Sequence, residues 1–91
     1  MTEKEKLGEE FKRLRENIPS KEYKGKPMSQ QELADHNTGV TKHLIGTIER
    51  GEANPTLEKI LYLAKSLNIK TISILNVDIN VEKFIKEIGK E

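Results

Sequence analysis

Few side chains in this sequence have the types and spacing that catalysis or metal binding requires. His36 and His43 are its two histidines, they fall in different predicted elements, and no cysteine is present to complete a metal site. Glu32 and Glu49 could supply paired carboxylates for acid–base chemistry, but each is assigned a structural role below. The sequence also lacks a glycine-rich phosphate-binding loop. We therefore expect no enzyme activity, no metal site and no cofactor.

The length and charge of the chain favour a small binding module. A chain of 91 residues suits one domain with a small core, which a large substrate cavity would empty. Its 16 basic and 15 acidic residues leave a formal net charge of +1, which creates no global positive field. The charged amino terminus does not resemble a signal peptide, and no run of about 20 apolar residues predicts a membrane span. We expect a cytoplasmic protein with no membrane partner.

The elements that position the polar residues are predicted to be helices. Leu7, Phe11 and Leu14 recur at helical spacing among Glu and Lys residues, so a first amphipathic helix is predicted over residues 3–17. The next residues, 19–27, hold two prolines, a glycine and several charges, which is typical of a solvated loop.

Two more helices are predicted around a short polar turn. Ser29 followed by Glu32 fits a capping box, in which the hydroxyl and the carboxylate each accept a backbone N–H, so a second helix is predicted over residues 30–35. A polar run that includes a glycine then forms the turn. Thr41 fits the N-cap of a third helix at about residues 41–50.

The carboxy-terminal part is also predicted to be helical. Thr56 and Asn80 fit the N-caps of a fourth helix and of a last helix. Residues 69–75 are rich in β-branched types, but a lone strand would leave its backbone unpaired, so a short helix is predicted there. The expected fold is all-α, with a five-helix domain over residues 1–76. The helical extension over residues 77–91 either covers the core or forms a dimer contact.

Several spaced motifs follow one pattern between residues 7 and 75. They are Leu7-Gly8-Glu9 leading to Leu14-Arg15, then Ser29-Gln30-Gln31-Glu32-Leu33-Ala34, Ile45-Gly46-Thr47-Ile48-Glu49-Arg50-Gly51 and Asn54-Pro55. This pattern resembles the lambda-repressor-like, Cro-type helix-turn-helix proteins, also called the xenobiotic response element family. The resemblance implies a sequence-specific transcriptional regulator, a repressor in the simplest case, that binds double-stranded DNA as a homodimer.

The resemblance also implies roles for individual residues. Apolar side chains would anchor the third helix from below, so that its other side enters the major groove. Lys42, His43 and Thr47 fall at base-reading positions of the family. The residues placed at the DNA backbone are Gln30, Thr41 and Asn54, together with Arg50, which we expect on the same outward side. Arg15 and Glu49 correspond to a partly buried ion pair between the first and third helices.

The chain departs from the family in two places, and its charge leaves an alternative open. The turn at residues 36–40 is one residue longer than the family's, and the loop that ends at Pro27 is several residues longer. Residues 29–57 hold four acidic and two basic side chains, so the attraction to phosphate would come from flanking lysines. These lysines are Lys21, Lys24, Lys26 and Lys59, of which the first three fit a solvated loop and a phosphate clamp equally well. The weak positive charge also fits an antitoxin or another module that binds a protein partner such as a toxin.

Overall fold

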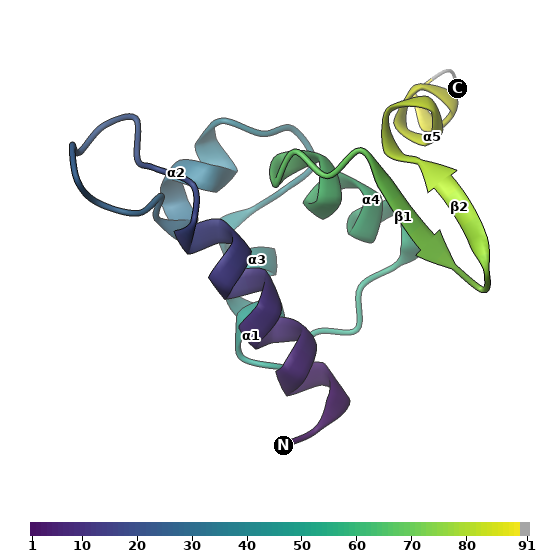
Figure 1. The fold of residues 1–91 in the computed structure, drawn as a ribbon, viewed down its shortest axis with the longest axis horizontal. Coiled ribbons are helices and arrows are strands. Elements are labelled where there is room, and N and C mark those ends of the chain that lie inside the picture. Colours follow the sequence, from purple (N-terminus) through teal and green to yellow (C-terminus); the bar gives the residue numbers. More distant parts are fainter. Residues whose placement is uncertain (90–91) are drawn as a thin grey trace. The chain divides into compact units, whose positions relative to one another are not determined.

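The computed structural model of the protein describes residues 1–89, in which the chain forms two compact units. Unit 1 comprises Met1–Asn54, and unit 2 begins at Pro55. The last two residues of the extension predicted over 77–91 lie outside the described range. The elements in chain order are α1 (Glu3–Glu16), α2 (Gln30–Asp35), α3 (Lys42–Glu49), α4 (Leu57–Ser66), β1 (Thr71–Ile74), β2 (Val77–Asn80) and α5 (Val81–Ile88), as coloured in Figure 1.

Helix α1 packs closely against α3 in unit 1. Thr2 caps α1 through a capping box with Glu5, and Phe11 is buried. Gly8 is the point of closest approach, since a Cβ atom there would lie 2.3 Å from the carbonyl oxygen of Ile48. Glycine thus lets the two helices meet backbone to backbone. Leu7, expected in the same buried stripe, is 57% exposed instead.

The short helix α2 and the helix α3 also pack against each other. Ser29 caps α2 and Thr41 caps α3, each by accepting a backbone N–H with its hydroxyl. Gly39 takes a φ of +80° in the turn between them, where a side chain would strain the backbone. Residues from all three helices and their connections form the core of this unit: Phe11, Met28, Leu33, Val40, Ile45 and Ile48.

The capping box predicted at the start of α2 is only half formed. The Ser29 hydroxyl accepts the N–H of Glu32 at 3.0 Å, as predicted. The Glu32 carboxylate does not return to Ser29. It accepts hydrogen bonds from Ser20 and Lys21 in the preceding loop, which are non-local partners that a cap motif does not reveal.

Unit 2 shows that the predicted all-α fold is wrong. Residues 71–74 and 77–80 form an antiparallel hairpin, in which Thr71 pairs with Asn80 and Ile74 pairs with Val77. Residues 71–74 form a strand and not the short helix predicted over residues 69–75, because β2 supplies a paired backbone through a two-residue turn. The chain is therefore a mixed fold of helices and one small sheet, rather than six helices.

The hairpin and two helices share the core of unit 2. Asn80 ends β2 and caps α5 by accepting the N–H of Lys83, as the sequence predicted for this residue. Helix α5 packs against α4 and against β2. The buried centre is Leu61, Ala64 and Val81, with Ile69, Ile72, Ile79, Phe84 and Ile85 packed on it. The expected boundary at residue 77 falls at the beginning of β2, inside this unit.

No helix within residues 1–89 combines the length and the apolar character needed to cross a bilayer.

Candidate nucleic-acid interface

Helix α3 has one anchored side and one open side. Ile45 is completely buried and Ile48 nearly so, which fixes the helix on the rest of unit 1. Lys42 and His43, in the first turn, are exposed, and so is Arg50 at the C-cap. Two of the three predicted base-reading residues therefore present hydrogen-bond donors to solvent from one end of a rigid helix.

Thr47, the third predicted base reader, is half-buried. Its hydroxyl donates to the carbonyl oxygen of Leu44 at 3.0 Å. Its own carbonyl accepts the N–H groups of Glu52 and Ala53, which closes the turn after α3. With the hydroxyl proton used inside the helix, this side chain offers a ligand its methyl group and an acceptor lone pair.

Gly46 is buried beneath two neighbouring side chains. A Cβ atom at this position would lie 3.1 Å from Nη1 of Arg50 and 3.6 Å from Oε1 of Gln30. Because Gly46 has no side chain, there is room over α3 for Arg50 and Gln30, which are both predicted to contact the DNA backbone. Arg50 also pairs with Glu52, Nε to Oε1 at 3.1 Å, in an exposed position.

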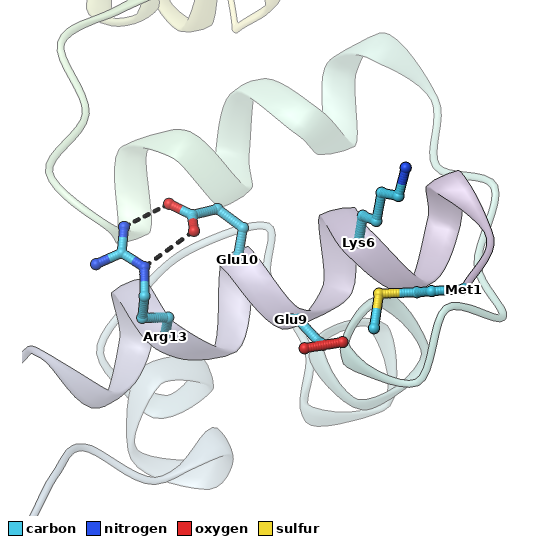
Figure 2. Close-up of a pocket in the computed structure, with 5 residues that line it drawn as sticks. All are labelled: Met1, Lys6, Glu9, Glu10 and Arg13. Atoms are coloured by element: carbon cyan, nitrogen blue, oxygen red, sulfur yellow. Dashed lines mark hydrogen bonds and ion pairs between the residues drawn. The ribbon is translucent and has the colours of Figure 1, made fainter.

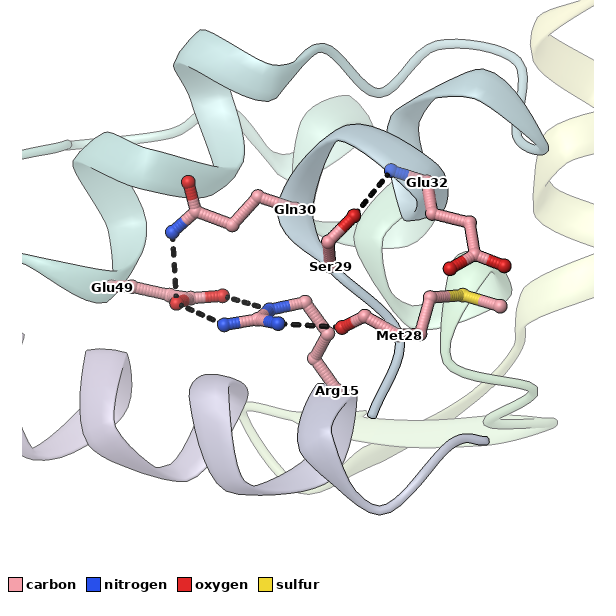
Figure 3. Close-up of polar contacts among 6 residues, drawn as sticks. All are labelled: Arg15, Met28, Ser29, Gln30, Glu32 and Glu49. Atoms are coloured by element: carbon pink, nitrogen blue, oxygen red, sulfur yellow. Dashed lines mark hydrogen bonds and ion pairs between the residues drawn. The ribbon is translucent and has the colours of Figure 1, made fainter. Parts of the chain in front are cut away.

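A buried ion pair joins α1 to the end of α3, as the family resemblance implied (Figure 3). Arg15 donates from Nε to Oε2 of Glu49 at 2.7 Å and from Nη2 to Oε1 at 2.9 Å. Its Nη1 donates to the carbonyl oxygen of Met28 at 2.6 Å. The hydrogen bonds with Glu49 raise the pKa of the Arg15 guanidinium. The two side chains are 7% and 5% exposed, so the pair is largely shielded from water.

Gln30 extends this network toward the surface. Its Nε2 donates to Oε1 of Glu49 at 3.0 Å, as Figure 3 shows. The sequence placed Gln30 at the DNA backbone and gave no sign of the bond to Glu49, which is 19 residues away. The amide of this residue is therefore oriented by the same carboxylate that holds Arg15.

The other residues predicted to contact the DNA backbone lie at the edges of α3 and of unit 1. Thr41 is exposed, and its hydroxyl accepts the N–H of Leu44 at 3.0 Å as the N-cap. Asn54 is exposed at the end of the unit. Lys59, named among the flanking lysines, is exposed on α4 in unit 2.

Glu32 has a role that the sequence did not indicate. The side chain is almost fully buried, and Figure 3 shows it turned away from the Arg15–Glu49 pair. Its Oε1 accepts the Ser20 hydroxyl at 2.7 Å, and its Oε2 accepts the N–H of Lys21 at 2.6 Å. The hydroxyl bond from Ser20 lowers the pKa of this carboxyl. Glu32 thereby fixes the loop between α1 and α2 onto α2.

Two other groupings of polar side chains are less informative. Ligand atoms of Glu22, Glu32 and His36 lie within 4.8 Å of one another, but the Glu32 oxygens already accept the bonds from the preceding loop. On α1, an open depression of about 370 Å³ is lined by charged residues of both signs and by Met1 (Figure 2). The Glu10–Arg13 ion pair in this depression is exposed, and exposed ion pairs contribute little to the stability of a fold.

Comparisons of the chain with protein-family models, with curated proteins and with solved structures found no match. The functional assignment therefore depends on the geometry of α3 and its neighbours in unit 1.

Proposed function

We propose that the chain is a sequence-specific DNA-binding regulator of transcription, which inserts α3 into the major groove of double-stranded DNA. The observation that carries the proposal is the asymmetry of α3. Its apolar side is fixed by Ile45 and Ile48, while Lys42 and His43 project from its first turn into solvent. The major groove is wide enough to admit one α-helix, and a rigid helix holds its donors in a defined register.

The chemistry of the exposed side chains fits base edges. Lys42 and His43 can each donate to O6 or N7 of guanine, and the methyl group of Thr47 can contact a thymine methyl. Each good contact of this kind contributes about 1–3 kcal/mol of discrimination against a wrong base. The Thr47 hydroxyl is bonded to Leu44, so we assign the apolar contact to this residue.

Contacts with the sugar–phosphate backbone would fix the register of α3 on the duplex. Gln30, Thr41, Arg50 and Asn54 are the candidates, all in unit 1. Arg50 is exposed and donates its Nε to Glu52, so the terminal nitrogens of its guanidinium can still donate to phosphate. The proposed form is a homodimer on a two-fold operator, with half-sites about 34–36 Å apart, one helical turn. A repressor in the cytoplasm is the simplest regulator of this kind.

Selection of bound duplexes from a random pool tests the proposal directly. We expect an enriched short palindrome and a loss of sequence preference for Lys42→Ala and Thr47→Ala. Lys12→Ala, which removes an exposed lysine of α1, is the matched control and should retain the preference. A pool with no enriched sequence overturns the proposal. Equal weakening on all sequences by Lys42→Ala would instead assign this lysine to phosphate.

A second candidate function is supported by the hairpin of unit 2. Leu75 is 92% exposed and Val77, two residues later, is 58% exposed, and exposed apolar patches mark contact sites for other proteins. An antitoxin that covers a toxin would use such a surface. A toxin-like gene beside this one, whose product forms a complex that Leu75→Ser weakens, would favour this candidate.

A further inference from the structure

Residues 18–28, the lysine loop, lie between α1 and α2 (Figure 1). Pro19 and Pro27 face each other in an antiparallel bridge. The N–H of Met28 donates to Ile18 at 2.8 Å, and the N–H of Ser20 donates to Lys26 at 2.8 Å. The backbone thus returns on itself as a small hairpin.

Two side chains fix the lysine loop on α2. The Ser20 hydroxyl donates to the Glu32 carboxylate and accepts the N–H groups of Glu22 and Tyr23 at 3.1 and 3.0 Å. The second oxygen of Glu32 holds the N–H of Lys21. Burial of a carboxylate is unfavourable unless its oxygens are satisfied, and here the loop satisfies both of them. The position of the loop is therefore tied to the helix that packs on α3.

The charge of the lysine loop is opposite to that of the segment it adjoins. Lys21, Lys24 and Lys26 are all exposed, and none of them forms an ion pair with another residue of the described chain. Glu22 is the single acidic residue among them. Residues 29–57, which carry α2 and α3, have an excess of acidic side chains. A duplex read by α3 would find little positive charge in that segment.

We propose that the lysine loop is a second, sequence-independent binding surface for the phosphate backbone of double-stranded DNA, held in position by Glu32. This inference rests on the proposed function of α3. Three unpaired lysines on a fixed backbone bind a polyanion with less loss of chain entropy than lysines on a free segment. When these lysines bind phosphates, they release the cations condensed on the DNA. This release supplies the salt-dependent affinity that the acidic residues 29–57 do not supply.

The test measures the affinity for the selected duplex from about 50 to about 300 mM salt. The variant carries Lys21→Gln, Lys24→Gln and Lys26→Gln. The control carries Lys4→Gln, Lys6→Gln and Lys12→Gln on α1, with the same change in net charge. For each subunit of the bound homodimer, loss of three phosphate contacts should reduce the slope of log K against log salt by about 2–3 and the affinity near 100 mM by about 10²-fold, with the preferred sequence unchanged.

Three outcomes separate this inference from the proposed function. A slope that falls for the loop variant and not for the control supports the phosphate surface. Equal slopes in the two triple variants overturn it and leave the reading by α3 intact. If the unmodified protein binds no duplex, the proposed function fails and this inference fails with it.

The positioning role of Glu32 needs its own variants. Glu32→Gln leaves one acceptor oxygen for two donors, the Ser20 hydroxyl and the N–H of Lys21, and Ser20→Ala removes the hydroxyl. Both should lose part of the salt slope while keeping all three lysines and the preferred sequence. Amide exchange of the lysine loop, read in the same samples, reports whether the loop is released. Faster exchange with an unchanged slope in both variants overturns the positioning role.

Discussion

The guanidinium of Arg15 on α1 donates two hydrogen bonds, at 2.7 and 2.9 Å, to the carboxylate of Glu49 at the end of α3. The Nη1 group of Arg15 donates to the carbonyl oxygen of Met28, which lies just before α2. One carboxylate and one guanidinium thus connect the three helices of unit 1. A bidentate pair of this geometry is more directional than a lysine contact.

Removal of Arg15 should destabilise the protein strongly. Arg15→Ala leaves the Glu49 carboxylate buried without its partner, and we expect a loss of about 3–5 kcal/mol in the free energy of unfolding. The matched control is Arg13→Ala, which breaks the exposed pair with Glu10 and should change the stability little. Chemical denaturation measures both. Similar losses in the two variants would contradict a buried role for the pair.

The close approach of α1 and α3 makes Gly8 intolerant of even one methyl group. In Gly8→Ala the new Cβ would meet the Ile48 carbonyl oxygen at 2.3 Å, so the helices must separate. The expected loss is about 1–3 kcal/mol, typical of overpacking. Gly89→Ala is the control, because its nearest heavy atom would be 3.5 Å away. Denaturation curves that rank Gly89→Ala as the more harmful change would refute this packing.

Helix ends were predictable from the sequence because capping is a local interaction. Thr41, Thr56 and Asn80 each accept a backbone N–H three residues ahead, where the sequence had placed them. The distance between cap and donor is fixed by helix geometry, so a reader of the sequence needs no tertiary information. The same holds for the buried Ile45, whose place follows from helical periodicity.

Partners that are distant in the sequence were not predictable in the same way. The Glu32 carboxylate bonds to Ser20, 12 residues earlier, because folding of the loop delivers a hydroxyl there. The β1–β2 hairpin was missed because its turn has Leu75 and Asn76 in place of the usual Asn-Gly. The Arg15–Glu49 contact, 34 residues apart, was reached only through the family resemblance.

The turn between β1 and β2 should be improved by substitution. Leu75 has a φ of +52°, a left-handed conformation that is unfavourable for a residue with a Cβ and that asparagine tolerates better. Because Leu75 is also exposed, Leu75→Asn removes strain without removing core contacts, and we expect a gain of up to about 1 kcal/mol. Thermal denaturation measures this gain. A lower stability would mean that Leu75 makes a contact with another copy or partner.

The buried carboxylate of Glu32 should make stability depend on pH. The hydroxyl bond from Ser20 holds the pKa of this group below its ordinary value of 4.5 in the folded chain. The unfolded chain therefore binds the proton more readily. The stabilisation is fully present above pH 4.5 and is lost as the pH falls through the lowered pKa of the folded protein.

A comparison with Glu32→Gln isolates this contribution. Denaturation of both proteins from about pH 7 to about pH 3 gives a difference in unfolding free energy to which the other carboxylates, common to both, contribute equally. We expect the wild type to be the more stable at neutral pH and its advantage to shrink below pH 4.5. Ser20→Ala, which removes the main cause of the lowered pKa, should show a weaker form of the same trend. An advantage that is constant over the whole range would show that Glu32 gains nothing from its charge.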